Sequence, residues 1–183
     1  MPTRLRDRLV EQLALRYRRW ATRRLRVTPG AVLSAARGIM RRRRYCLLAT
    51  PGEGGVDARV LQPFPPDRDL TVWLGTSRSS RKVAQLRRDP SATLAYQDDP
   101  GHACAVLVGR ATVVEALAER QGRFMPFWRA FWPEGPGSDD FVLLRFEPVR
   151  IEVWDARRRV TPPPFGLRSA CVTRAADGTW EKA

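Results

Sequence analysis

The stretch at residues 74–90, which reads LGTSRSSRKVAQLRRDP, constrains the fold of this chain more than any other segment. Residues 70–74, LTVWL, precede it and have the β-branched and aromatic content of a strand. Val83 and Leu86 then follow with helical spacing until Pro90 ends the helix. The sequence therefore predicts a strand that enters a helix through a tight turn.

The start of this predicted helix gathers groups that bind anions. Hydroxyls and cations lie together there, in Thr76, Ser77, Arg78, Ser79, Ser80, Arg81 and Lys82. Free backbone N–H groups and the positive end of the helix dipole coincide with them. Lys82 is one of two lysines in a chain with 31 arginines, which suggests that an ammonium is specified at this position. Two interpretations stay open from the local pattern: a phosphate site, and a serine-capped surface helix whose arginines face water.

The other strand and turn signals predict a mainly β, α+β fold. A second helix, after an N-terminal one, is expected at residues 30–42, and a later one at residues 117–131 is interrupted near Pro126. Strands are expected at residues 45–50, 57–62, 70–74, 92–96, 103–115, 141–147 and 149–155, with a bulge or bend at Gly109. Because strands succeed one another with few helices between them, the order favours an antiparallel β-barrel with peripheral helices. Residues 156–183 are expected to form an extended tail.

The composition argues against several classes of protein. No apolar run reaches about 18 residues, so no membrane-spanning helix is expected, and no secretory signal follows Met1. Cys46, Cys104 and Cys171 are far apart and odd in number, which fits a reducing, cytoplasmic location. Neither the cysteines nor the single histidine, His102, has the spacing of metal ligands, so no metal is expected. Glycine-rich nucleotide-binding motifs are absent from the sequence.

The positive charge belongs to the N-terminal segment. The chain has a net charge of +14, and residues 1–44, with fourteen arginines and two acids, contribute +12 of it. Residues 3–26 predict a basic amphipathic helix, within an accessory unit at residues 1–29. Its apolar stripe consists of Leu5, Leu9, Leu13, Tyr17 and Trp20. Three interpretations stay open: a helix docked on the body or on a second subunit, a contact with a membrane surface or nucleic acid, and an organelle import signal.

Several short motifs occur in an order that resembles a known family. They are Ala58-Arg59-Val60-Leu61 on a strand, a strand ending in Gly75-Thr76-Ser77, Ser80-Arg81-Lys82 at a helix start, Asp89-Pro90, and Val106-Leu107-Val108-Gly109-Arg110-Ala111. Together they resemble the pyridoxamine 5′-phosphate oxidase-like flavoproteins, which are FMN-binding split β-barrels. The closing Ile151-Glu152-Val153-Trp154 resembles the general-stress-protein branch. The resemblance covers residues 31–155 and implies an FMN-binding antiparallel split barrel of about six to seven strands at residues 30–155.

The resemblance also implies roles for individual residues. Arg59, Ser80, Arg81 and Lys82 would hold the FMN phosphate, a role that suits guanidinium, hydroxyl and helix N–H groups together. Thr76 and Ser77, with Gly75 beside them, would contact the isoalloxazine ring and the ribityl chain. Val60 and Leu61 would line the cofactor site next to Arg59, and Trp154 would lie near the flavin across a homodimer. No catalytic acid or base stands out.

Departures from the family pattern narrow the expected function. Gln62 stands where a lysine is frequent, and Cys104 stands near the position of a glutamine that reaches the flavin. The Arg-x-His pair that grips pyridoxal phosphate is absent after Trp154, which argues against a true pyridoxamine phosphate oxidase. The expectation is therefore an FMN-dependent oxidoreductase of the general-stress type, with no specific nucleic-acid partner. The alternatives are a deazaflavin-binding reductase on the same fold and a non-enzymatic flavin-binding or redox-sensing protein.

Overall fold

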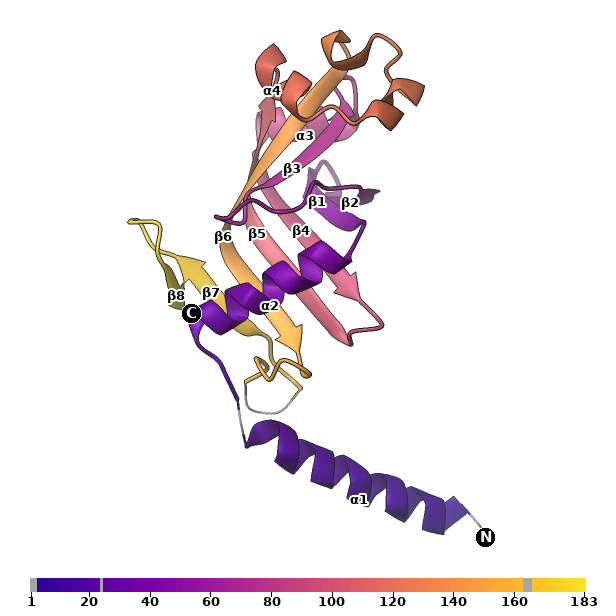
Figure 1. The fold of residues 1–183 in the computed structure, drawn as a ribbon, viewed down its shortest axis with the longest axis vertical. Coiled ribbons are helices and arrows are strands. Elements are labelled where there is room, and N and C mark those ends of the chain that lie inside the picture. Colours follow the sequence, from indigo (N-terminus) through magenta and orange to yellow (C-terminus); the bar gives the residue numbers. More distant parts are fainter. Residues whose placement is uncertain (1–2, 24, 163–165) are drawn as a thin grey trace.

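A computed structural model of the chain describes residues 3–23, 25–162 and 166–183 (Figure 1). The helices are α1 (Thr3–Thr22), α2 (Pro29–Arg42), α3 (Arg81–Arg88) and α4 (Leu117–Gly122), with 3₁₀ turns at Pro126–Ala130 and Gly135–Gly137. The strands are β1 (Cys46–Gly52), β2 (Gly55–Leu61), β3 (Val72–Ser77), β4 (Ser91–Asp98), β5 (Ala103–Val114), β6 (Phe141–Asp155), β7 (Ala170–Arg174) and β8 (Trp180–Lys182). The Leu5 side chain, expected in the apolar stripe of the first helix, lies outside the described part of the structure.

The strands form one antiparallel sheet that curls into a split barrel. The sheet order is β2-β1-β4-β5-β6-β7-β8, and β3 pairs with the first half of β6. After β2 the chain returns to β3, where Pro63 bridges Leu74 and the Phe64 N–H donates to the Trp73 carbonyl at 2.8 Å. The bridge closes the circuit from β2 through β6 and β3. The prediction of an α+β antiparallel split barrel is confirmed, with eight strands in the described chain rather than six to seven.

The strand β6 runs without a break where two strands had been expected at residues 141–147 and 149–155. It pairs with β5 along almost its whole length, and the register shifts between Val108 and Gly109, opposite Pro148. The strand itself is continuous, and only its pairing with β5 is irregular. Val149 of β6 has no partner on β5 and forms a bulge. The bulge predicted at Gly109 is confirmed.

The segment after Asp155 is not the extended tail that the sequence analysis expected. It carries β7, which pairs with β6 from Val153↔Ala170 to Arg150↔Thr173, and β8, which pairs with β7. Ala170 and Val172 alternate into the core and are almost fully buried, which accounts for the pairing. Pro163 and Pro164, on which the expected tail rested, lie outside the described residues.

Two apolar clusters stabilise the barrel. The larger one lies between α2 and the sheet, and α2 contributes Val32, Ala35, Ala36, Ile39 and Met40 to it (Figure 1). The smaller one lies on the opposite face of β3 and contains Trp73, Trp128, Phe141 and Leu143. The helix expected at residues 117–131 is in fact α4 followed by a 3₁₀ turn, because Pro126 cannot continue an α-helix.

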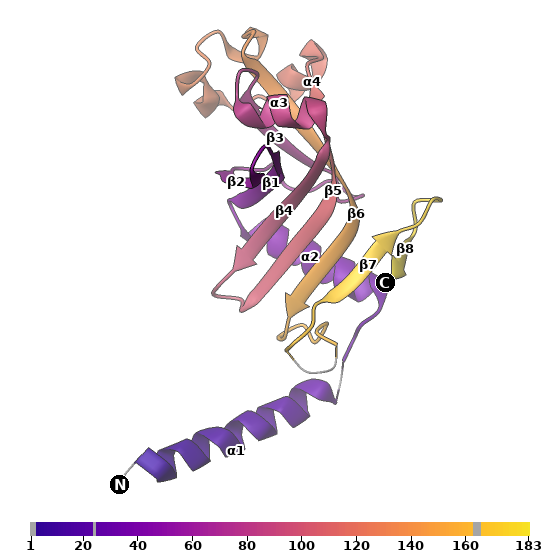
Figure 2. The ribbon, with the colours of Figure 1, turned by 180° about the vertical axis from the view of Figure 1, so that it is seen from behind.

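The helix α1 projects from the barrel and is seen free of it from both sides (Figures 1 and 2). Every side chain from Arg6 to Trp20 is exposed. Near the end of the helix the Arg159 guanidinium lies over the Trp20 ring, 4.5 Å from its centroid, but the helix does not pack along its length on the barrel of its own chain, as one of the expectations had it. No helix in the described ranges combines the length and the apolar character needed to cross a membrane.

Gly109 tests the account of the bulge. A Cβ atom at this position would lie 2.1 Å from the Glu147 carbonyl oxygen, and that oxygen belongs to the backbone of β6. We expect Gly109→Val to lower the free energy of unfolding by at least about 2 kcal/mol in urea denaturation, because the strands must move apart. Gly122→Ala is the matched control, since nothing lies within 4 Å of its added Cβ. Equal losses in the two variants would contradict the bulge as the cause.

Candidate functional site

The turn between β3 and α3 is held in place by residues that precede β6. The Arg78 N–H donates to the Asp140 carbonyl at 2.6 Å, and the Ser79 N–H donates to Oδ1 of Asp140 at 3.0 Å. Hydrogen bonds from Ser77 and from the Ser79 N–H hold the pKa of the Asp140 carboxyl below its usual value. The N–H groups of Arg78 and Ser79 are thus already bound by Asp140 of the same chain, and this acid does not bind the residues at the start of α3.

Arg59 connects the β1–β2 hairpin to α3. Its side chain is only 19% exposed. Its guanidinium donates to Oγ1 of Thr50 at 2.6 Å and to Oε1 of Gln85 at 3.0 Å. Thr50 also donates to Oε1 of Gln85 at 2.8 Å, so one amide oxygen accepts from both neighbours. The network fixes the guanidinium beside the helix, since a partly buried charge is stable only when its donors are satisfied.

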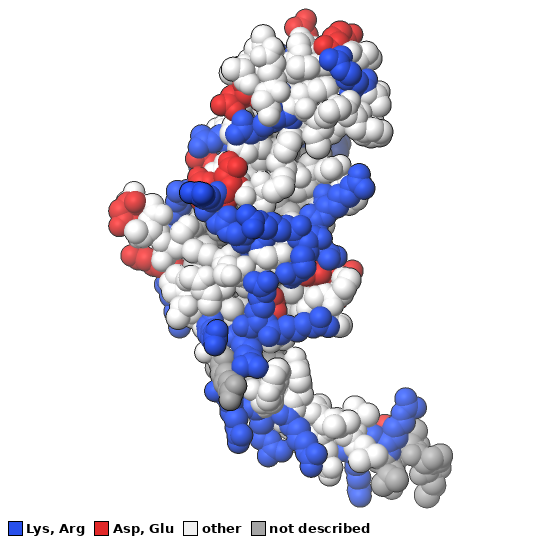
Figure 3. Space-filling view, viewed as in Figure 1, with Lys and Arg blue, Asp and Glu red and all other residues white. Residues whose placement is uncertain are grey.

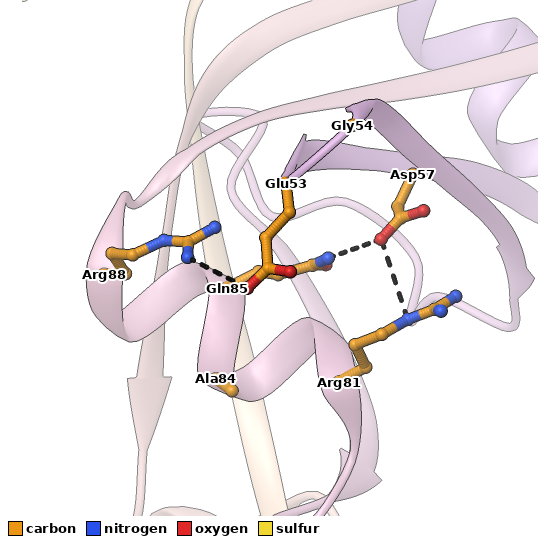
Figure 4. A pocket seen from close by; sticks show the side chains of 7 residues that line it. All are labelled: Glu53, Gly54, Asp57, Arg81, Ala84, Gln85 and Arg88. Atoms are coloured by element: carbon orange, nitrogen blue, oxygen red, sulfur yellow. Dashed lines mark hydrogen bonds and ion pairs between the residues drawn. The ribbon is translucent and has the colours of Figure 1, made fainter.

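Asp57 supplies the negative charge that the structure places in this network. The Gln85 amide donates to its carboxylate, which lies 3.6 Å from Nε of Arg81 (Figure 4). The same carboxylate lies 3.8 Å from the Arg59 guanidinium. An open cavity of about 360 Å³ lies between the β1–β2 turn and α3. It is lined by Glu53, Gly54, Asp57, Arg81, Ala84, Gln85 and Arg88.

Lys82 extends the positive site towards β3. Its ammonium donates to Oγ1 of Thr76 at 2.8 Å, and the side chain is half buried. Burial, and next to it the charge of Arg59, lower the pKa of Lys82 below its ordinary value. Burial also lowers the pKa of Arg59, with Asp57 opposing this shift and Arg81 adding to it. The three cations repel one another, and an added anion would relieve that repulsion.

Ser80 provides a direct test of whether a phosphate fits. It is the residue that caps the start of α3, yet its side chain makes no capping hydrogen bond. Its Oγ is buried and has no hydrogen-bond partner in the described part of the chain. A buried hydroxyl without a partner costs free energy, so it indicates a ligand at this place. The residues therefore fit a phosphate group: Ser80, Arg59, Arg81 and Lys82.

The other predicted contacts are divided between the two faces of β3. Thr76 lies with Lys82 on the face that looks into the barrel. Gly75 faces the aromatic cluster, and a Cβ there would lie 2.4 Å from the Trp128 ring. The Ser77 hydroxyl lies 2.8 Å from that of Ser79, on the Asp140 side of the turn. Within one chain, Thr76 is the member of this trio that lies next to Lys82 at the start of α3.

The remaining predicted residues lie at the edge of the site or away from it. Leu61 packs against the main core, and Val60 points outward with 62% of its surface exposed. Trp154 lies on β6, which is separated from β2 by three strands, and its indole donates to the Gly166 carbonyl at 2.9 Å. A single chain does not bring Trp154 to Arg59.

Three residues of the site had not been predicted from the sequence. Gln85, Thr50 and Asp57 complete the Arg59 network, and none of them had been singled out. Gln85 carried a signal that could have been used, because it is a polar residue on the buried side of a short helix, between Val83 and Leu86. Arg78, one of the cations at the predicted helix start, is engaged within the chain. Its side chain donates to the Asp139 carbonyl at 2.7 Å and lies 3.0 Å from the Glu115 carboxylate.

The fold and the site together define a split-barrel protein with a cationic, hydroxyl-bearing anchor at a helix start. A sequence model of the family described as "Pyridoxamine 5'-phosphate oxidase like" matches residues 35–176. The match covers well over half of the sequence, so the chain belongs to this family. It includes β7, which the sequence analysis had left outside the barrel. A search of curated proteins finds no match.

Solved structures agree in fold. A protein from Clostridium acetobutylicum, related to general stress protein 26 and assigned to the pyridoxinephosphate oxidase family, aligns with a TM-score of 0.62 at 20% identity, over 69% of this chain and 89% of that one. A pyridoxamine 5′-phosphate oxidase-related, FMN-binding protein from Nostoc punctiforme aligns with a TM-score of 0.59 at 19% identity, over 84% and 94%. A heme-binding protein from Mycobacterium smegmatis aligns with a TM-score of 0.53 at 19% identity, over 70% and 60%.

Gln85→Met tests the network. The substitution keeps the length of the side chain and removes its amide, so Arg59, Thr50 and Asp57 each lose a partner. We expect the free energy of unfolding to fall by roughly 1–3 kcal/mol. Gln97→Met is the control, because Gln97 is exposed and donates to Asp99 at the surface. Thermal or urea unfolding measures both, and a loss no larger than that of the control would show that the network contributes little.

Proposed function

We propose that this chain is an FMN-binding flavoprotein, with the phosphate of the cofactor held at the start of α3. The observation that carries the proposal is the buried, unpartnered hydroxyl of Ser80 beside Arg59, Arg81 and Lys82. Membership of a family with an FMN-binding relative in its fold supports it. A phosphomonoester dianion suits these groups, because guanidinium, ammonium and hydroxyl donors each bind its oxygens.

Each anchor residue has a separate task in this proposal. Arg59 is oriented by Thr50 and Gln85 before the phosphate arrives, so little side-chain entropy is lost on binding. Lys82 keeps its proton when the phosphate binds, because the anion counteracts the effects of burial and of Arg59. Asp57 holds Arg81 and Gln85 on the hairpin side of the helix. Bound FMN would supply the electron-transfer chemistry.

The ribityl chain and the isoalloxazine ring would follow from the phosphate along β2 and β3. Thr76 adjoins Lys82 and is the first candidate for a ribityl contact. Val60, Leu61, Gly75 and Ser77 complete the proposed lining. Trp154 would belong to the site formed with a second subunit, because its own chain holds it away from Arg59.

We further propose an oxidoreductase of the general-stress type, distinct from a true pyridoxamine phosphate oxidase. After Trp154 the chain reads Asp155-Ala156-Arg157-Arg158. Arg158 is engaged within the chain, since its guanidinium donates to the Ser34 carbonyl at 3.1 Å and lies 3.8 Å from Asp155. One alternative is a deazaflavin-binding reductase, because a ribityl phosphate on the deazaflavin ring would bind to the same residues. The other alternative is a redox sensor that binds the flavin without enzymatic turnover. The three free cysteines support a cytoplasmic location.

A homodimer is part of the proposal. The outer face of the sheet exposes Leu47, Val56, Val60 and Val149. These residues come from β1, β2 and β6. An open, mainly apolar cavity of about 520 Å³ lies on the same part of the sheet, and residues of β1, β2, β4, β5 and β6 line it. An apolar face of this extent is typical of a subunit interface. In this proposal the second copy contributes its Trp154 to the flavin site.

The first test is cofactor binding. We expect Arg59→Ala and Lys82→Ala each to weaken the affinity for FMN by about 10- to 100-fold, because each removes a charged hydrogen bond to the phosphate. Fluorescence titration measures it. Riboflavin, which lacks the phosphate, should bind all variants alike, and Arg87→Ala should match the wild type because Arg87 pairs with Glu115 at the surface.

The outcomes of this titration separate the possible failures. Unchanged FMN affinity in both variants would place the anchor elsewhere, and a parallel loss of riboflavin binding would indicate misfolding. Mass spectrometry of the native protein should identify FMN, and a deazaflavin mass would favour the alternative. A colourless protein that takes up no FMN would end the flavin proposal.

The dimer has its own test. Val60→Glu should convert a dimer into a monomer in light scattering, because it buries a charge in the proposed interface. Leu117→Glu is the control, since Leu117 is similarly apolar and exposed but lies at the start of α4. A wild-type protein that is monomeric at all concentrations, or a dimer untouched by Val60→Glu, would contradict this interface.

A further inference from the structure

We propose that α1 binds an anionic phospholipid surface and holds the barrel against it. The helix carries an apolar row of Leu9, Leu13, Tyr17 and Trp20, repeated at steps of four, four and three residues. Their exposed fractions range from 46% to 64%. Tyr17 stacks on Trp20, and Arg159 lies over the Trp20 ring, yet all four side chains keep a large apolar area in water. Burial of that area in the lipid interface is favourable.

The rest of the helix surface carries its charged side chains, most of them arginines, together with the exposed Val10 and Leu15. The helix contains six arginines and two acids, a net charge of +4. Among the described residues, Arg8, Arg16, Arg18 and Arg19 form no ion pair with a carboxylate of the chain. Their charges are thus available to lipid phosphates, and each cation near an anionic bilayer contributes about 1 kcal/mol of attraction.

The basic surface continues from α1 onto the barrel. Figure 3 shows Lys and Arg side chains gathered over α1 and over the face that carries α2. The run Arg41-Arg42-Arg43-Arg44 begins in the last turn of α2 and continues past it, whereas the chain beyond it is nearly neutral at +2. Arg42 and Arg43 pair with Asp98, and Arg41 and Arg44 have no carboxylate partner among the described residues. A bilayer that receives α1 would therefore meet further cations from α2, and the nearly neutral remainder of the barrel would not oppose the approach.

A lipid surface fits these observations better than the other occupants do. Nucleic acid would pair with the arginines but leave the apolar row in water. A second copy of α1 would cover the row, but it would bring two sets of arginines together with only Asp7 and Glu11 on each helix to offset them. Lipid alone takes both faces at once, with acyl chains against the row and headgroups beside the arginines.

The test is flotation of the full chain with vesicles of phosphatidylcholine and phosphatidylglycerol, or of phosphatidylcholine alone. We expect at least about tenfold stronger partition into the anionic vesicles, falling with added salt. Leu9→Ser combined with Leu13→Ser should weaken that partition at least about tenfold. Leu15→Ser is the matched control, because Leu15 is 49% exposed but lies about 200° around the helix from Leu13.

Circular dichroism and thermal unfolding establish that the variants are folded, which is expected since all three leucines are exposed. Arg8→Gln combined with Arg19→Gln should weaken partition into the anionic vesicles at least about tenfold, because two cations of the helix are removed. Equal partition into both kinds of vesicle, or unaltered partition of the double serine variant, would overturn the proposal. So would binding of duplex DNA without binding of vesicles. An oligomer that dissociates in the double serine variant, with no vesicle binding by the wild type, would assign the row to a second copy instead.

Discussion

The site depends on one charge, the partly buried guanidinium of Arg59. Arg59 lies on β2, the strand at the edge of the sheet, where neighbouring strands on one side only can hold its side chain in place. Thr50 on β1 and Gln85 on α3 satisfy the guanidinium from two directions, and in doing so they fix α3 against the hairpin. The helix start, with Ser80, Arg81 and Lys82, is then carried to its position beside β3. Val83 and Leu86 pack the buried side of α3, and Lys82 and Arg87 add contacts with Thr76 and Glu115.

Two acids determine which anion-binding groups remain available. Asp140 takes the Ser79 N–H and the Ser77 side of the turn, and Asp57 lies near the guanidinium groups of Arg59 and Arg81. Both distances from Asp57 exceed 3.5 Å, so neither is a close hydrogen-bonded pair. Lys82 has a neutral partner, Thr76, and Ser80 has none among the described residues. The chain thus orders its cations without neutralising them, which a tightly paired site would not achieve.

Local patterns were sufficient for the strand-turn-helix at residues 70–90, for the first hairpin and for the bulge at Gly109, because turn residues, proline and glycine act within a few positions. They were insufficient where the structure depends on contacts between residues that are far apart in the sequence. Nothing near Ala170 says that β6 has a free edge to receive it, and nothing near Pro148 says that Val149 is the residue of β6 left over in the pairing with β5. Gln85 failed for a related reason: its partners Thr50 and Arg59 lie 35 and 26 residues earlier. The sequence also could not show that Gly75 and Thr76 have different surroundings, because Gly75 lies against the Trp128 ring, which is distant in the sequence.

The division of charge along the sequence becomes a division in space. The arginine-rich α1 lies at one end of the long axis and α3 near the other (Figure 1). Electrostatic interactions between exposed charges fade over a Debye length of about 8 Å at physiological salt. The arginines of α1 are thus too far away to alter the pKa of Lys82, which answers to burial and to Arg59. Association of α1 with another surface and binding of a phosphate at α3 can therefore proceed independently, and a change at one end should leave the affinity at the other unaltered.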